Sequence, residues 1–130
     1  MKSVLTGDIV SSSSVSNPDF WLDPLKRVLR EHGDSPGKWE IFWGDSFQAL
    51  SEPEKSLILA FRIKSVIKKQ KKTNLDVRIA IGLGMNEHKP DKISEATGDA
   101  FTRSGRLLEK LKEERRLLGI ESPWKPFNDE

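Results

Sequence analysis

Apolar and polar residues alternate most clearly between positions 75 and 83 of the chain. Every second residue there is apolar, and the set that would share one face is Leu75, Val77, Ile79, Ile81 and Leu83. A period of two is typical of a β-strand with one well-buried face. Short apolar or aromatic runs predict four further strands, over residues 2–9, 38–43, 46–50 and 115–121.

Apolar residues at helical spacing predict three helices, over residues 19–32, 51–70 and 98–113. Asp23 followed by Pro24 has the pattern of a helix cap and a first-position proline, so the first helix is alternatively expected to begin there. Ser51 and Glu54, three residues apart with Pro53 between them, predict a capping box at the second helix.

The predicted order is β-α-β-β-α-β, followed by a loop, a helix and a strand. The first six elements match a ferredoxin-like unit, so the fold class is α/β (α+β): a ferredoxin-like βαββαβ core with an added αβ unit. Ser104 and Gly105 in the last helix are small, which should let that helix approach a sheet closely. We expect one domain over residues 1–122 and a short tail over residues 123–130.

Composition and charge narrow the class of protein. The 130 residues include no cysteine, which excludes disulfides and thiolate metal sites. The N-terminal apolar run contains Asp8 and is too short for a signal peptide or a membrane span, so we expect a soluble cytoplasmic protein. The formal charge of +2 gives no argument for nucleic acid. Lysines cluster near the end of the second predicted helix, at Lys64, Lys68, Lys69, Lys71 and Lys72. A solvated helix end explains this cluster better than a nucleic-acid-binding patch does.

Two aspartates are the strongest candidates for chemistry. Asp8 lies near the end of the first predicted strand, and Asp45 lies in the turn between the second and third. In a ferredoxin-like sheet the first and third strands are neighbours, so both carboxylates should meet at one end of the sheet. Such a pair suits Mg²⁺ or Mn²⁺ together with phosphate oxygens. The alternative is that Asp8 caps a loop and Asp45 is an ordinary turn residue.

Four segments in order then resemble the class III nucleotidyl cyclase domains. These are Gly7-Asp8-Ile9-Val10, Gly44-Asp45-Ser46-Phe47-Gln48-Ala49, Arg78-Ile79-Ala80-Ile81-Gly82, and the helix from Gly98-Asp99-Ala100-Phe101 to Arg106-Leu107. The opening Gly-Asp-Ile-Val and the Gly-Asp-x-Phe-Gln pattern are most similar to the SatD-like bacterial proteins. The resemblance implies a cyclase-like fold with metal bound at Asp8 and Asp45.

The resemblance also implies positions for a purine nucleotide and its reaction. Nucleotide contacts fall on Ile9, Val10 and Ser11 after the first aspartate, and on Glu95 at the base-reading position. Transition-state positions fall on Arg106, which keeps the family's arginine, and on Thr102, which replaces an asparagine. The base-reading lysine is replaced by Ile41, so base recognition is largely lost. Arg106 is alternatively an ordinary helix arginine paired with an acid.

Three functions remain open at this point. The first is a regulatory cyclase-like domain that binds a divalent metal and a nucleotide with little or no cyclase activity. The second is an active nucleotide phosphotransfer enzyme, and the third is a purely structural dimerisation module. Because cyclase domains of this family pair head to tail, the resemblance also implies a homodimer. Trp43 and Phe47 are candidate anchors of that interface, with a monomer that buries them as the alternative.

Overall fold

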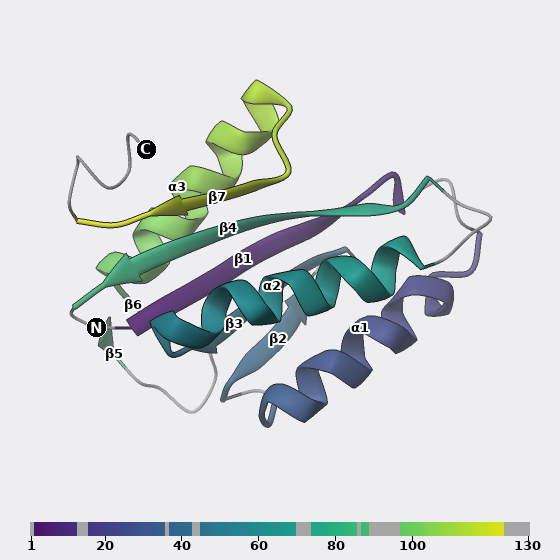
Figure 1. The fold of residues 1–130 in the computed structure, drawn as a ribbon, viewed down its shortest axis with the longest axis horizontal. Coiled ribbons are helices and arrows are strands. Elements are labelled where there is room, and N and C mark those ends of the chain that lie inside the picture. The colour runs from purple at the N-terminus through teal and green to yellow at the C-terminus, as the bar shows by residue number, and fades with distance from the viewer. Residues whose placement is uncertain are drawn as a thin grey trace.

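The structure is a computed structural model that describes residues 2–12, 16–35, 37–42, 45–69, 74–85, 87–88 and 97–123. One five-stranded sheet has the order β2-β3-β1-β4-β7 (Figure 1). Its strands are β1 (Lys2–Val10), β2 (Trp39–Phe42), β3 (Ser46–Ser51), β4 (Asp76–Gly84) and β7 (Leu118–Glu121). Neighbouring strands are antiparallel except β4 and β7, which are parallel. A small separate ladder pairs β5 (Glu87–His88) with β6 (Thr97–Gly98), and it was not predicted.

Helices cover both faces of the sheet. They are α1 (Asp19–His32), α2 (Pro53–Lys68) and α3 (Asp99–Glu114). Figure 1 shows α1 and α2 on one side of the sheet and α3 on the other. The path β1-α1-β2-β3-α2-β4 is the expected ferredoxin-like unit, and α3 with β7 is the added αβ unit. The predicted fold class is therefore confirmed.

The alternation of residues along β4 decides which side chains meet which helix layer. Val77, Ile79 and Ile81 are fully buried in the main core, together with residues of α1 and α2. Ala80 lies on the opposite face and forms a smaller apolar cluster with leucines of α3. Two cores on the two faces of one strand explain why β4 contains few large polar residues.

Close packing of α3 depends on Gly82, and the role expected for Gly105 is wrong. A Cβ at Gly82 would lie 2.3 Å from the Ala100 carbonyl oxygen and 2.5 Å from the Ser104 nitrogen. A Cβ at Gly105 would meet nothing within 4 Å. The small residues that allow the approach are therefore Gly82 on the strand and Ser104, which is fully buried on the helix.

Helix α1 spans Asp19–His32, so the predicted range of residues 19–32 is confirmed. The alternative start at Asp23 is wrong, and Pro24 lies inside the helix. The extra first turn buries Trp21, and the amides of Trp21 and Leu22 bond to the Pro18 carbonyl. Burial of a large aromatic side chain outweighs the one backbone hydrogen bond that the proline removes.

The predicted capping box at α2 is also wrong. Ser51 is the last residue of β3, and the helix begins at Pro53 without a side-chain cap. The cross-strand pairing of Ser51 with Ser3 accounts for the difference, because the Ser3 hydroxyl donates a hydrogen bond to the Ser51 carbonyl at 2.8 Å. A long-range strand pairing thus overrides a local helix signal.

Part of the basic cluster at the end of α2 has a structural role. Lys64 Nζ and Lys68 Nζ each lie 3.3 Å from the carboxylate of Asp76, at the start of β4. Burial acts against the charge of Asp76, but the Val77 amide and both lysines outweigh it, so the pKa of Asp76 falls below its usual 3.8. Lys71 and Lys72 lie outside the described residues.

The lowered pKa of Asp76 predicts a pH dependence of stability. Because the folded form binds the proton less tightly than the unfolded chain, the contribution of Asp76 is present above about pH 3.8 and is lost as pH falls toward the folded pKa. We expect Asp76→Asn to lower the free energy of unfolding by about 1 kcal/mol at pH 7. Urea unfolding at pH 7 and pH 3 should show this deficit shrinking in acid. Asp23→Asn on the exposed side of α1 is the control, and an equal deficit at both pH values would contradict the assignment.

Candidate functional site

The structure brings Asp8 and Asp45 to the same end of the sheet. Asp8 on β1 lies opposite Ser46, the first residue of β3, in the antiparallel register. The Ile9 amide donates a hydrogen bond to the Asp45 carbonyl oxygen at 2.9 Å. The two backbones are therefore direct neighbours, as the sequence predicted for two acids 37 positions apart (45 minus 8).

Asp8 lies on the face of the sheet that α3 covers, between two cations. Arg78 is its direct cross-strand neighbour on β4, and Arg78 Nη1 lies 3.2 Å from each carboxylate oxygen of Asp8. Lys112 Nζ, from the last turns of α3, lies 3.5 Å from Asp8 Oδ2. The side chains of Asp8 and Arg78 are only 12% and 18% exposed, so solvent screens this pair less than a surface ion pair.

Asp45 is held by the turn that follows β1. The Ser12 hydroxyl donates a hydrogen bond to Asp45 Oδ2 at 3.0 Å. Ser11 before it has a φ of 66°, in the left-handed region that residues other than glycine rarely adopt. Such backbone strain is often found at functional sites. The contact of Ser12 with Asp45 was not predicted from the sequence.

The predicted nucleotide contacts differ in what they offer to a ligand. The Ile9 side chain belongs to the α1–α2 core and is 3% exposed, and the Ile9 amide donates to the Asp45 carbonyl, so neither group is free for a ligand. Val10 ends β1 and is half-buried, and Ser11 lies at the exposed turn. Glu95 lies outside the described residues, as does the interface candidate Trp43.

Thr102 and Arg106 lie one turn apart on α3, on the side away from the sheet. Both are exposed, whereas Ser104 between them is fully buried against the sheet. The Thr102 hydroxyl bonds back to the Gly98 carbonyl at 3.1 Å. Arg106 has no ion pair with any residue that the structure describes, so the alternative of a paired helix arginine finds no support there. Within one chain, Arg106 therefore lies on the face of α3 opposite Ser104, away from the sheet.

A polar row runs next to Asp8 on the same face of the sheet. Gln48 Nε2 on β3 donates to Thr6 Oγ1 on β1 at 3.3 Å, and Thr6 Oγ1 lies 2.8 Å from Ser104 Oγ on α3. Thr6 and Asp8 share this face because they are two residues apart in one strand. Thr6 and Lys112 could not be predicted as neighbours of Asp8 from the sequence, because only the folded chain brings them next to it.

The carboxylates fit a hard divalent cation as far as their chemistry goes. Asp8 and Asp45 supply carboxylate oxygens at adjacent backbone positions, and Mg²⁺ is commonly held by one or two carboxylates with water or phosphate oxygens. Across the described ranges, no group of three or more histidine, aspartate or glutamate side chains could hold a metal ion. A metal ion at this site would therefore take its remaining coordinating atoms from water or from a bound molecule.

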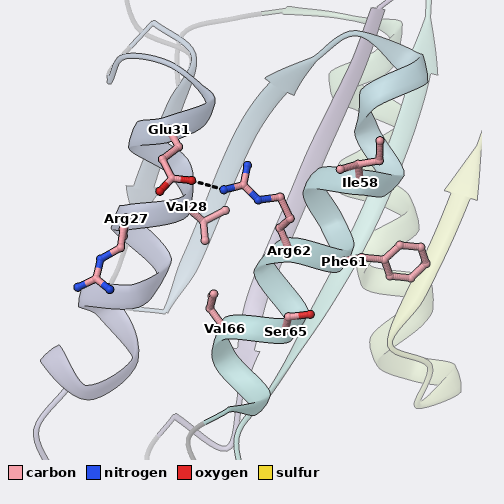
Figure 2. Close-up of a pocket in the computed structure, with 8 residues that line it drawn as sticks. All are labelled: Arg27, Val28, Glu31, Ile58, Phe61, Arg62, Ser65 and Val66. Atoms are coloured by element: carbon pink, nitrogen blue, oxygen red, sulfur yellow. Dashed lines mark hydrogen bonds and ion pairs between the residues drawn. The ribbon is translucent and has the colours of Figure 1, made fainter.

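A second surface feature lies between α1 and α2, on the other side of the sheet. This groove has a volume of about 430 Å³. Its lining residues are Arg27, Val28, Glu31, Ile58, Phe61, Arg62, Ser65 and Val66. Figure 2 shows Glu31 and Arg62 pointing toward each other across the groove, where they form an ion pair. It contains none of the predicted site residues.

Comparisons with known proteins place the fold but not the activity. No protein-family model matches the chain, and no curated protein sequence matches it. The solved structure of a bacterial light-regulated adenylyl cyclase superposes with a TM-score of 0.58 and 16% sequence identity, covering 92% of this chain and 74% of that one. A second structure of this kind gives a TM-score of 0.57 at 16% identity, and this chain spans 42% of its length.

The described part of the chain contains no helix long and apolar enough to cross a membrane.

At 16% sequence identity, the structural similarity to the adenylyl cyclases establishes the architecture alone. The superposition covers most of the chain, which contains the five-stranded sheet and the three helices. The chain therefore has a nucleotidyl cyclase-like fold.

Proposed function

We propose that this chain is a cyclase-like regulatory domain that binds a divalent metal, Mg²⁺ or Mn²⁺, through Asp8 and Asp45 and a purine nucleotide through that metal. The observation that supports the proposal is the hydrogen bond from the Ile9 amide to the Asp45 carbonyl, which makes the backbone next to Asp8 a neighbour of Asp45 at one end of the sheet. Membership of the SatD-like group and a cytoplasmic location belong to the same proposal.

The two aspartates offer ligands to a metal, whereas the base-reading position offers none to a purine. Mg²⁺ is usually held by one or two carboxylates, phosphate oxygens and several waters. Ile41 at the base-reading position packs against the main core, where an apolar side chain offers no hydrogen bond to a purine edge. A nucleotide would therefore be held mainly by its phosphates, with little choice between adenine and guanine.

Calorimetric titration with ATP and with GTP, each with and without Mn²⁺, tests this proposal. We expect binding of both nucleotides with similar affinity, and only in the presence of Mn²⁺. Nucleotide binding of equal affinity with and without Mn²⁺ would contradict the proposed metal-binding role of the two aspartates. A strong preference for ATP or for GTP would contradict the inference that Ile41 leaves the site without base recognition.

We predict little or no adenylyl cyclase activity. Thr102 bonds to the backbone of its own helix, and Ile41 cannot orient adenine, so the ring-closing geometry lacks two of its supports. Incubation of purified protein with ATP and Mn²⁺, followed by chromatography for cyclic AMP, measures this. Robust cyclic AMP production that Asp45→Ala abolishes would instead establish the active enzyme.

We predict that the chain forms a homodimer with a shared site. Thr102 and Arg106 lie on the face of α3 away from the sheet of their own chain, so they can act at such a site only on a second copy. A closed twofold pair is the commonest arrangement for such an exchange. Phe47 is fully buried in the core of its own chain, so it is not available as the expected interface anchor.

Light scattering on the purified chain tests the homodimer. We expect a dimer mass at high micromolar concentration, and Arg106→Glu should leave the secondary structure unchanged while weakening the dimer. A monomer at that concentration would remove the shared site and leave Thr102 and Arg106 without a role in it.

A further inference from the structure

Asp8 is already occupied by two cations of its own chain. Arg78 approaches both of its carboxylate oxygens at 3.2 Å, and Lys112 approaches one of them at 3.5 Å. A metal ion at Asp8 would have to compete with this pair. Among the described residues no cation contacts Asp45, whose carboxylate accepts a hydrogen bond from the neutral hydroxyl of Ser12.

The charges of the side chains in contact around Asp8 balance. Asp8 and Glu109, whose Oε1 lies 3.3 Å from Lys112 Nζ, contribute two negative charges, and Arg78 and Lys112 contribute two positive charges. A divalent cation would leave the cluster with an excess of two positive charges. Such an excess attracts a phosphate-bearing anion, and guanidinium and ammonium groups are the usual phosphate donors in proteins.

We infer that Arg78 and Lys112 are exchange partners: they hold Asp8 while no metal is bound, and they bind phosphate oxygens of the ligand when a divalent cation takes Asp8. This inference rests on the proposed metal site and adds its regulation. A bound metal frees Arg78 and Lys112 for phosphate, and bound phosphate keeps these cations away from Asp8. Binding of either one therefore raises the affinity of the site for the other.

The geometry of Arg78 suits such an exchange. It is fixed opposite Asp8 by the strand register, and its Nε also donates to the Arg116 carbonyl at 3.4 Å, at the edge of β7. The guanidinium can therefore lose one acceptor while it keeps another. Arg78 Nη1 donates to both oxygens of Asp8, and phosphate oxygens accept from a guanidinium as carboxylate oxygens do, so a phosphate can replace the carboxylate.

The first arm of the test measures Mn²⁺ binding by calorimetry at fixed pH, with no nucleotide present. Arg78→Gln should bind Mn²⁺ roughly tenfold more tightly than the unmodified chain, because the competing charge is gone. Lys112→Gln should give a smaller gain in the same direction, and it is the second variant in case Arg78→Gln does not fold. Arg62→Gln is the matched control, since it removes an arginine ion pair on the opposite side of the sheet.

The second arm is pyrophosphate binding in the presence of a chelator. Asp8→Asn should bind pyrophosphate several-fold more tightly than the unmodified chain, because Arg78 loses its carboxylate partner and Lys112 keeps only the exposed Glu109. The double variant Asp8→Asn with Arg78→Gln should lose that gain. Asp23→Asn on α1 removes the same charge elsewhere and should change nothing.

The outcomes separate the inference from the proposed function. If the unmodified chain binds Mn²⁺ but both Arg78→Gln and Lys112→Gln bind it no more tightly than Arg62→Gln, the exchange is wrong and the metal site stands. If none of the variants binds Mn²⁺, the proposed function fails and the exchange fails with it. If Mn²⁺ binding tightens but Asp8→Asn gains no pyrophosphate affinity, the cations only block the metal, and their phosphate role is overturned.

Discussion

Gly82→Ala should lower the free energy of unfolding by about 3 kcal/mol, near the upper end of the usual cost of overpacking. The added Cβ would lie 2.3 Å and 2.5 Å from backbone atoms of Ala100 and Ser104. Backbone atoms of a helix cannot rotate away as a side-chain tip can, so α3 must shift from the sheet. Urea unfolding followed by circular dichroism measures the change.

Gly105→Ala is the matched control for this experiment. It adds the same methyl group to the same helix, at a position with no neighbour within 4 Å. It should raise the free energy of unfolding by about 0.5–1 kcal/mol, since alanine is the better helix former. Equal effects of the two substitutions would contradict the packing of α3 described above.

Asp45→Ala should weaken Mn²⁺ binding by about 100-fold or more, which is the largest functional effect expected for one substitution in this chain. The side chain of Asp45 contacts Ser12 and no described cation, so its removal takes away a metal ligand without leaving a buried charge unpaired. Paramagnetic resonance of free Mn²⁺ gives the bound fraction directly. Asp23→Ala removes an aspartate from the exposed side of α1 and should bind Mn²⁺ like the unmodified chain. Unchanged affinity in Asp45→Ala would exclude this residue as a ligand.

The sequence predicted the sheet well because the signals there are periodic. Val77, Ile79 and Ile81 alternate with small or polar residues, and the structure buries all three in one core. The same regularity placed Asp8 at a strand end and Asp45 in the following hairpin turn. Neighbouring backbones at those positions follow from the topology alone.

Local signals failed where contacts distant in sequence decided the outcome. Ser51 pairs with Ser3 across the sheet instead of capping α2. The start of α1 is set by the burial of Trp21, which a proline pattern does not reveal. The cations around Asp8 were invisible for the same reason, because Arg78 and Lys112 come from a different strand and a helix.

Diffraction from crystals soaked in Mn²⁺, with the anomalous signal of the metal, tests the shared site most directly. We predict one strong peak with carboxylate oxygens of both Asp8 and Asp45 within roughly 2.5 Å, and with the Arg78 guanidinium turned away from Asp8. Carboxylates more than about 10 Å apart, or a site without a peak where Asp8 still binds Arg78, would contradict a metal held by these two aspartates.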